Sequence, residues 1–348
     1  MRVLIIKTSS LGDIIHALPV LDYLHQVAPG ITIDWAVEEQ FTELLSGNPL
    51  LSALRVVRTR AWRRKPLKAE TIQEIRAFRR ELWDQCYDLV FDIQGNLKSG
   101  VIARSTGVKQ RFGFSSDHLQ ESFNAMLITH QVRIRPEDDY AGGRYLRIVS
   151  APFERDYRGM ELTADIHTGP EHDARAGALA QVCGVGPVFL FHAGTTWQTK
   201  FWSEENWAAL GRMVVSGFPG AVILLSWGND TERSAAERIA GVIGNAAQLL
   251  DKYPLKGIAA IIKRVDVVIG GDTGLIHLAA AVGTPTVSYY RASDGSVSGP
   301  RGKTHVIVQA PLSCTRCQRT SCRRDAECRA SITPAMIYAG IEKVVTSG

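Results

Sequence analysis

The segment Val267-Val-Ile-Gly-Gly-Asp-Thr-Gly-Leu-Ile-His277 is the most informative part of this 348-residue chain. A short apolar run ends in two glycines, and Asp272 and Thr273 then precede residues with helical spacing. The pattern predicts a strand, a tight turn and a helix N-terminus, whose free N–H groups and positive dipole end suit a phosphate. We expect Thr273 and Gly274 to meet the phosphate, and Asp272 to cap the helix or bind sugar hydroxyls. An ordinary turn with a capping Asp is the simpler alternative.

The same alternation of apolar runs and amphipathic segments extends over the whole chain. Strands are expected at residues 3–6, 31–37, 54–57, 88–93, 188–191, 221–226, 265–269 and 286–290. Helices are expected at residues 14–27, 69–84, 97–105, 204–215, 231–243, 255–263 and 274–282. The pattern predicts an α/β fold of two Rossmann-like, doubly wound parallel-sheet domains facing a central cleft. The predicted units are 1–165, 166–333 and a C-terminal helix at 334–348.

Composition is that of an ordinary globular protein, with 45% apolar and 22% charged residues. No window approaches the roughly 18 consecutive apolar residues that a membrane helix needs. The first residues, Met1 to Lys7, are typical of a buried strand and not of a signal peptide. We therefore expect a cytoplasmic protein with no transmembrane segment.

The basic residues are concentrated in one segment. Residues 55–80 contain ten Lys or Arg and two Glu, a local charge of +8 within a chain whose net charge is +5. A solvated helix face would explain such a run, and a docking surface for an anionic partner would explain it equally. Nucleic acid is not expected as that partner, since a single strand would call for several interleaved aromatic residues and only Trp62 and Phe78 are present. A phosphorylated lipid surface or an anionic sugar fits better.

A candidate catalytic group lies in Lys7-Thr-Ser-Ser-Leu-Gly-Asp-Ile-Ile-His16, which predicts a strand, a small-residue loop and a helix. Ser10 and Gly12 allow a ligand close to the backbone. Asp13, at the carboxyl end of a strand, can serve as a general base, although an Asp in a first helical turn also simply complements the helix dipole.

A second strand–Gly–helix segment, Phe91-Asp-Ile-Gln-Gly-Asn-Leu-Lys-Ser99, offers two polar side chains. Gln94 and Lys98 are candidates for contacting a polar ligand. Equally, Gln94 belongs to the turn and Lys98 to the surface.

In the second half, Thr195, Thr196 and Lys200 follow a buried strand. Two hydroxyls and an ammonium group at one strand end can surround a diphosphate. Glu232 follows the next strand and can accept hydrogen bonds from a ribose or another sugar, or belong to an ordinary acidic first turn.

Four cysteines near the C-terminus have the spacing Cys314-x2-Cys317-x4-Cys322-x5-Cys328. The leading pair is typical of zinc sites, but the spacing of the second pair is not. Structural zinc, reduced thiols and a disulfide all remain open, and no cofactor is required by the rest of the sequence.

Taken in order, these motifs resemble glycosyltransferase family 9, the ADP-heptose:lipopolysaccharide heptosyltransferases, and within it the heptosyltransferase I group. The resemblance rests on several segments along nearly the whole chain: 7–16, 34–39, 92–99, 192–196, 227–228 and 272–277. It implies a GT-B fold, an ADP-heptose donor in the second domain and a Kdo-lipid A acceptor in the first. It also implies inverting transfer without a metal, by a monomer held by charge at the cytoplasmic face of the inner membrane.

The resemblance also implies residue roles. Asp13 matches the base, Glu232 an adenosine-side carboxylate, and His277 a residue near the sugar and diphosphate. The acceptor loop would comprise Arg60, Arg63, Arg64 and Lys65. Gln120 stands where an acceptor-binding Arg is expected, which puts the identity or phosphorylation of the acceptor in doubt.

Three alternatives stay open. They are heptosyltransferase II, which adds the second heptose, a nucleotide-sugar epimerase, and a non-catalytic nucleotide-sugar-binding or assembly protein.

Overall fold

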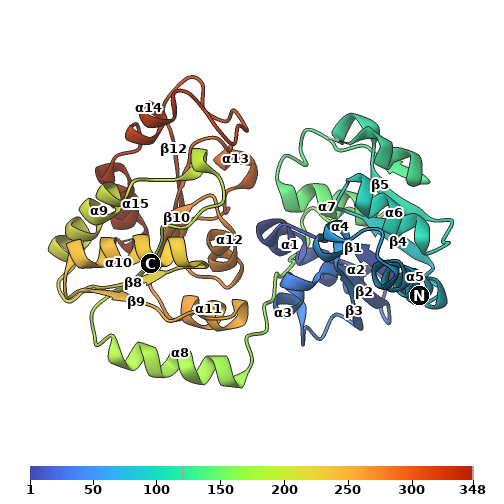
Figure 1. Cartoon of the computed structure of the whole chain (residues 1–348), viewed down its shortest axis with the longest axis horizontal. Helices are drawn as coiled ribbons and strands as arrows, with labels where there is room; N and C mark the ends of the chain where they lie inside the picture. Colours follow the sequence, from blue (N-terminus) through green and yellow to red (C-terminus); the bar gives the residue numbers. More distant parts are fainter. Residues whose placement is uncertain (120, 347–348) are drawn as a thin grey trace. The chain divides into compact units, whose positions relative to one another are not determined.

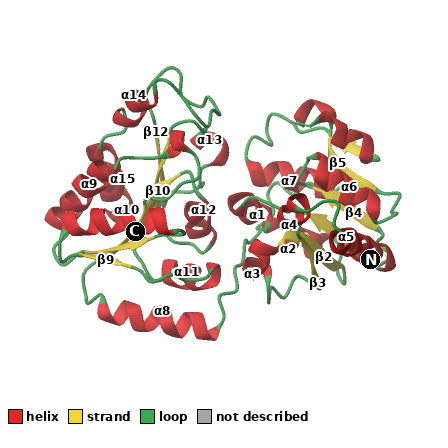
Figure 2. Ribbon diagram, viewed as in Figure 1, coloured by secondary structure: helices red, strands yellow, loops and turns green. Residues whose placement is uncertain are grey.

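The computed structural model describes residues 1–119 and 121–346 and divides the chain into two compact units, Met1–His167 and a second that begins at Thr168. Each unit is an α/β assembly around one six-stranded sheet (Figure 1). Within both sheets every described strand pair is parallel. Helices cover both faces of each sheet (Figure 2), as parallel sheets require because both faces are apolar.

The first unit has the strand order β3-β2-β1-β4-β5-β6. Its strands are β1 Arg2–Ile6, β2 Thr32–Glu38, β3 Ala53–Val57, β4 Leu89–Asp92, β5 Arg111–Phe114 and β6 His130–Val132. Its helices are α1 Leu11–Ala17, α2 Pro19–Val27, α3 Thr42–Leu45, α4 Thr59–Arg64, α5 Ala69–Asp84, α6 Leu97–Ser105 and α7 Ala141–Ser150.

The second unit has the order β12-β11-β10-β7-β8-β9. Its strands are β7 Val188–His192, β8 Val222–Ser226, β9 Ala247–Leu249, β10 Val267–Gly271, β11 Thr286–Tyr290 and β12 His305–Gln309. Its helices are α8 Pro170–Val182, α9 Glu204–Gly217, α10 Asp230–Ile243, α11 Leu255–Ile262, α12 Gly274–Ala281, α13 Gly295–Ser298, α14 Asp325–Ala330 and α15 Pro334–Thr346.

Each unit has its own apolar core. In the first unit, Leu4 and Ile6 of β1 point to one face and pack with Phe78 and Leu82 of α5. In the second unit, strand residues pack against helices α9, α10 and α15 in one buried cluster, in which Trp202 and Trp207 are fully buried. The C-terminal helix α15 therefore belongs to the second core and contacts β11 and β12.

Both strand orders place a topological switch point in the middle of the sheet. In the first unit the chain reverses its direction of progress between β1 and β4, and in the second between β7 and β10. The loops that leave these strands diverge at a switch point, which opens a crevice at the carboxyl ends of the strands where ligands of such sheets bind. The predicted site residues follow these same strands.

The structure differs from the expected elements in several places, and helices α3, α4, α7, α8, α13 and α14 were not predicted. The single helix expected at residues 14–27 is two helices, α1 and α2, because Pro19 lacks an N–H group and its ring collides with the preceding turn. Strands β5, β6, β9 and β12 were not predicted. Strands β5, β6 and β9 have only three or four residues and so show no long apolar run, whereas β12 contains Val306-Ile307-Val308 but is half-buried or exposed throughout.

Among the described residues, no helix is both long enough and apolar enough to cross a membrane.

Candidate functional site

At the switch point of the first unit, the loop after β1 presents Asp13 in the first turn of α1. Its Oδ2 accepts hydrogen bonds from the Ser10 backbone N–H at 3.1 Å and the Ser10 hydroxyl at 2.8 Å. Its Oδ1 accepts a hydrogen bond from the Tyr145 hydroxyl at 2.9 Å and lies 3.9 Å from Lys7 Nζ. The carboxylate is thus held in place from both sides, yet its side chain is still 41% exposed.

The surroundings of Asp13 favour its ionised form. Partial burial by itself would raise the pKa of this carboxyl, but the Lys7 charge and the hydrogen bonds from Ser10 and Tyr145 outweigh burial and hold the pKa below its ordinary value. Lys7 is buried, which lowers the pKa of its ammonium group, and the group lies 4.5 Å from the centre of the Tyr145 ring. The result is an accessible carboxylate ready to accept a proton at neutral pH.

The neighbouring loop after β4 is organised by a buried carboxylate. Asp92 is fully buried and accepts hydrogen bonds from the N–H groups of Gln94 and Gly95, from Ser99 Oγ and from Asn124 Nδ2. Burial raises the pKa of Asp92 despite these hydrogen bonds. The network fixes the turn before α6 and therefore the place of the side chains on it.

Gln94 joins the two loops at this switch point. Its Oε1 accepts hydrogen bonds from the backbone N–H groups of Thr8 at 2.9 Å and Ser9 at 3.0 Å. These two hydrogen bonds occupy the carbonyl oxygen of Gln94 and hold the two loops together. Only the amide nitrogen is left for the predicted contact with a ligand. Gly12 is buried inside α1, and Lys98 is half-buried on α6.

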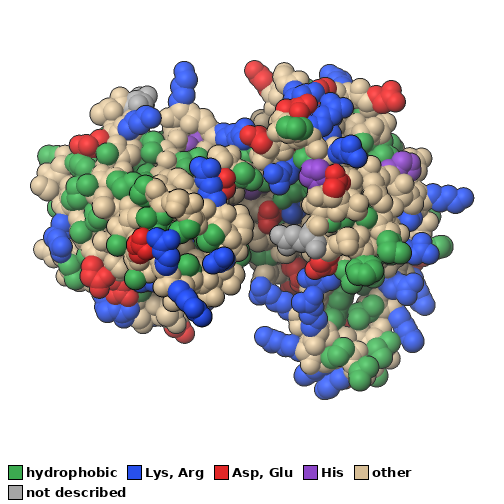
Figure 3. Space-filling model, turned by 90° about the horizontal axis from the view of Figure 1, so that it is seen from above, with side chains coloured by type: hydrophobic (Ala, Val, Ile, Leu, Met, Phe, Trp, Pro, Cys, Tyr) green, Lys and Arg blue, Asp and Glu red, His purple; other side chains and the backbone are tan. Residues whose placement is uncertain are grey.

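The four cationic residues assigned to the acceptor loop lie on α4 and just after it, and all four are exposed. Arg60 donates a hydrogen bond to Gln40 at 2.8 Å, whereas within the described residues Arg63, Arg64 and Lys65 make no ion pair. Lys and Arg side chains stand out on the surface of this unit (Figure 3). Arg55, from the same basic run, is instead buried against Asp34 and Glu81, so not all of the run is surface charge.

At the switch point of the second unit, Asp272 follows β10 and lies between two cationic or potentially cationic groups. Its Oδ2 accepts a hydrogen bond from Lys200 Nζ at 2.6 Å, and its Oδ1 lies 3.4 Å from His277 Nε2. Burial by itself would raise the pKa of Asp272, but His277 and Lys200 overcome it and hold the pKa well below its ordinary value. Lys200, expected to face a diphosphate, is therefore already paired, and it neutralises the charge that would repel one.

The N-terminus of α12 has the features of the predicted anion site, except that Asp272 does not cap the helix. Its N-cap is Thr273, not Asp272, and Gly274 is the first helical residue. The Thr273 hydroxyl oxygen is buried and has no hydrogen-bond partner among the described residues. A buried polar atom without a partner is unfavourable, so a ligand oxygen at this helix end would satisfy it.

The first turn of α10 carries Glu232 to the carboxyl end of β7. Its Oε2 accepts the Gly228 N–H at 2.8 Å, and a Cβ atom at Gly194 would lie 2.5 Å from the same oxygen. Only glycine at position 194 leaves room for this carboxylate. Thr195 is half-buried and Thr196 is exposed in the loop that follows.

The four C-terminal cysteines surround one small cavity together with Arg291 and Asp325. Among the described residues, however, no group of three or more His, Cys, Asp or Glu side chains is arranged to hold a metal ion. All four are free thiols in the structure. The zinc alternative thus finds no support here.

Sequence reasoning missed two groups that position Asp13. Lys7 carries a local signal, since a lysine directly after a buried strand must be paired. Tyr145 carries none, because it lies 132 residues from Asp13 on the unpredicted helix α7. Gln120, singled out for its departure from the expected Arg, lies outside the described residues.

A sequence model of glycosyltransferase family 9 (heptosyltransferase) matches residues 75–327. Lipopolysaccharide heptosyltransferase 1 of Pseudomonas aeruginosa is 34% identical over 92% of this chain and 87% of its own length. The protein of that name from Escherichia coli K12 is 31% identical over 89% of this chain and 94% of its own.

Solved structures of heptosyltransferases have the same fold as this chain. Escherichia coli heptosyltransferase WaaC with ADP has a TM-score of 0.79 and 28% identity, covering 99% of this chain and 100% of its own. The fold is also that of Escherichia coli ADP-heptose lps heptosyltransferase II, with a TM-score of 0.79 at 16% identity over 100% of this chain and 99% of that one.

Proposed function

The chain belongs to glycosyltransferase family 9, the heptosyltransferases, and from that premise we propose that it transfers a heptose from ADP-heptose to the Kdo-lipid A inner core of lipopolysaccharide. The observation that carries this proposal is its likeness, over most of its length, to proteins named lipopolysaccharide heptosyltransferase 1. A related WaaC structure contains ADP-2-deoxy-2-fluoro heptose, which supports ADP-heptose as the donor. Residues 166–333 would hold the donor and residues 1–165 the acceptor.

Asp13 is the proposed general base. It removes the proton from the acceptor hydroxyl, whose oxygen forms a bond to the anomeric carbon as the bond from that carbon to the diphosphate breaks. The electron pair of the broken bond leaves on ADP, and the configuration inverts in this single displacement. The support is that Asp13 is ionised, accessible and fixed by Ser10 and Tyr145.

The departing ADP gains negative charge, which groups in the second unit are suited to stabilise. Thr195, Thr196 and the N-terminus of α12, with the Thr273 hydroxyl, would contact the diphosphate. Lys200 adds positive charge, and it turns toward the phosphates if they displace it from Asp272. Fixed donors and a cation can provide this stabilisation without a metal ion.

Acceptor binding would rely on the exposed cations of α4 and the residue that follows it. Arg63, Arg64 and Lys65 would attract acidic sugars and lipid phosphates and hold a monomeric enzyme at the inner membrane surface by charge alone. Such attraction weakens as salt rises.

The proposal is tested by ADP release from ADP-heptose with and without Kdo2-lipid A. We expect release only with acceptor, and a loss of about 10²–10⁴ in kcat for Asp13→Asn, the usual contribution of a general base. Asp84→Asn, which removes an exposed carboxylate at the end of α5, is the matched control and should retain activity.

Release without acceptor, or full activity of Asp13→Asn, would contradict the proposed mechanism. Transfer only to an acceptor that already carries one heptose would make the protein a heptosyltransferase II. Donor binding with no transfer to either acceptor would make it a binding protein.

A further inference from the structure

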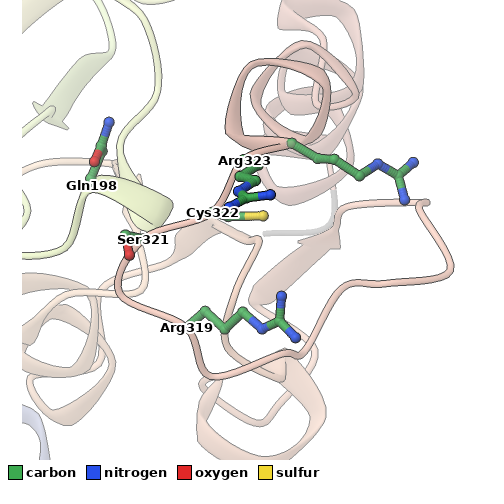
Figure 4. A pocket seen from close by; sticks show the side chains of 6 residues that line it. Gln198, Arg319, Ser321, Cys322 and Arg323 are labelled. Atoms are coloured by element: carbon green, nitrogen blue, oxygen red, sulfur yellow. The ribbon is translucent and has the colours of Figure 1, made fainter.

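A pocket of about 710 Å³ lies in the second unit beside the segment that links β12 to α14. It is lined by Gln198, Arg319, Ser321, Cys322, Arg323 and Arg324. Gln198 comes from the segment before α9, whereas the labelled arginines come from the segment after β12 (Figure 4). The lining has three guanidinium groups and no carboxylate, so its chemistry suits an anion.

Two of the three arginines that line this pocket are not neutralised by the acidic residues nearby. Residues 314–329 contain five Arg and two acidic residues, a local charge of +3. Asp325 is bound by Arg291 and Arg329, and Glu327 is bound by Arg324. In the described part of the chain, Arg319 and Arg323 make no ion pair, although both line the same pocket.

The backbone that carries these arginines is fastened to the rest of the unit. The Thr199 hydroxyl donates a hydrogen bond to the Arg319 carbonyl at 2.5 Å, and the Gln318 N–H donates to the Ala292 carbonyl at 2.8 Å. Arg291, which is 1% exposed, bonds Asp325 at 2.7 Å. An anchored backbone reduces the entropy lost when the side chains close on a ligand.

The pocket adjoins the proposed donor site without sharing its residues. Gln198 and Lys200 lie in the same short helix, η5 Gln198–Lys200, and Lys200 is bonded to Asp272. Yet none of the residues proposed to hold the diphosphate lines the pocket. An ADP-sugar has only one diphosphate, which is already assigned to those residues, so the donor offers no second anion for this pocket.

We propose that this pocket is a phosphate subsite for the acceptor, in which Arg319 and Arg323 bind a phosphate group of the glycolipid. This inference rests on the proposed heptosyl transfer, and it adds a contact from the nucleotide-binding unit to the acceptor. Guanidinium groups are suited to it because each can make two parallel hydrogen bonds to one phosphate.

The first test measures phosphate binding to the whole protein and needs no transfer activity. Inorganic phosphate is titrated by calorimetry into protein saturated with ADP, so that the donor site is filled. We expect Arg319→Gln/Arg323→Gln to weaken phosphate binding at least tenfold, since each removes charge-assisted hydrogen bonds. The matched control Arg212→Gln/Arg301→Gln removes two exposed arginines elsewhere in the unit and should bind as the wild type does. Equal binding by all three proteins would overturn the proposal.

The second test identifies the source of the phosphate. With Kdo2-lipid A, the double variant should raise the acceptor KM about tenfold and leave the ADP-heptose KM and kcat within about twofold. Wild-type enzyme should show a rise at least as large with acceptor freed of its phosphates, because the cations of α4 lose their phosphate contacts too, and the variant should distinguish the two acceptors about tenfold less than the wild type does.

Other outcomes would overturn this assignment. A higher ADP-heptose KM would place the pocket on the donor side. Loss of binding to phosphatidylglycerol vesicles without acceptor, at unchanged acceptor KM, would assign the pocket to membrane headgroups. If the wild type transfers no heptose while phosphate still binds at these arginines, the proposed function fails and the anion site stands.

Discussion

At the scale of single residues, the charge of Asp13 is set by contacts from distant parts of the sequence. The Tyr145 hydroxyl stabilises the carboxylate, so Tyr145→Phe should raise the Asp13 pKa. If Asp13 is the base, the acidic limb of the pH profile of kcat/KM should move to higher pH, because the carboxyl then loses its proton at higher pH. Tyr140→Phe is the control, since the Tyr140 hydroxyl bonds His16 and not Asp13. An acidic limb that stays in place in Tyr145→Phe would argue against this role of Asp13.

The Asp272–Lys200 pair makes a second prediction at this scale. Since the pKa of Asp272 is depressed in the folded protein, its ionisation stabilises the fold above the unfolded carboxyl pKa of about 4 and ceases to do so as the pH falls toward the native pKa. Asp272→Asn should therefore lower the free energy of unfolding by about 2–4 kcal/mol at pH 7, as expected for breaking a largely buried pair.

Urea denaturation between pH 3 and pH 8 checks this. The difference between the free energies of unfolding of wild type and Asp272→Asn should be larger at pH 5 than at pH 3, because it narrows below about pH 4. Asp251→Asn, which changes an exposed carboxylate in the same unit, serves as the control. A difference that does not depend on pH would show that the ion pair is not its source.

At the scale of elements, the turn between β4 and α6 depends on one glycine. Gly95 has a φ of +73°, and a Cβ atom there would lie 2.8 Å from Phe114 Cδ2. Gly95→Ala should lower the free energy of unfolding by about 2–4 kcal/mol, the sum of left-handed backbone strain and crowding. Gly159 also has a positive φ, of +81°, but a Cβ atom there would meet nothing within 4 Å. Gly159→Ala should therefore lower the free energy of unfolding by only about 1–2 kcal/mol. Equal losses in thermal or urea unfolding would exclude crowding at Gly95.

The sequence predicted the central elements better than the edges. Strands β1, β4, β7 and β10 are fully or mostly buried, so each appears as a run of apolar residues. The edge strands β6 and β9 have only three residues each and no fully buried position, so they leave no such signal. The candidate sites were accessible to sequence reasoning because they follow the central strands.

At the scale of the whole molecule, the two units have separate cores and should respond separately to ligands. We expect at least two unfolding transitions in calorimetry. ADP should raise the midpoint temperature of only the transition that belongs to the second unit. The stabilisation should be about 2.7 kcal/mol at an ADP concentration of 100 times Kd. The core variants Leu4→Ala and Phe191→Ala assign the transitions, because each should lower the free energy of unfolding of its own unit by about 2–5 kcal/mol. A shift of both transitions by ADP would show that the units unfold together.

The βαβ alternation, the division into two halves, the glycine turn at residues 270–274 and the family could all be inferred from the order of residues alone. These features are local, because period, capping and turn chemistry act over a few residues. The groups that set the charge of each candidate residue became known only from the folded chain. Tyr145 meets Asp13 across 132 residues, and Lys200 meets Asp272 across 72. The physical reason is that parallel sheets bring the carboxyl ends of distant strands to one edge, where Lys200 meets Asp272, and that α7 packs against α1, where Tyr145 meets Asp13. Neither contact has a fixed spacing in the chain.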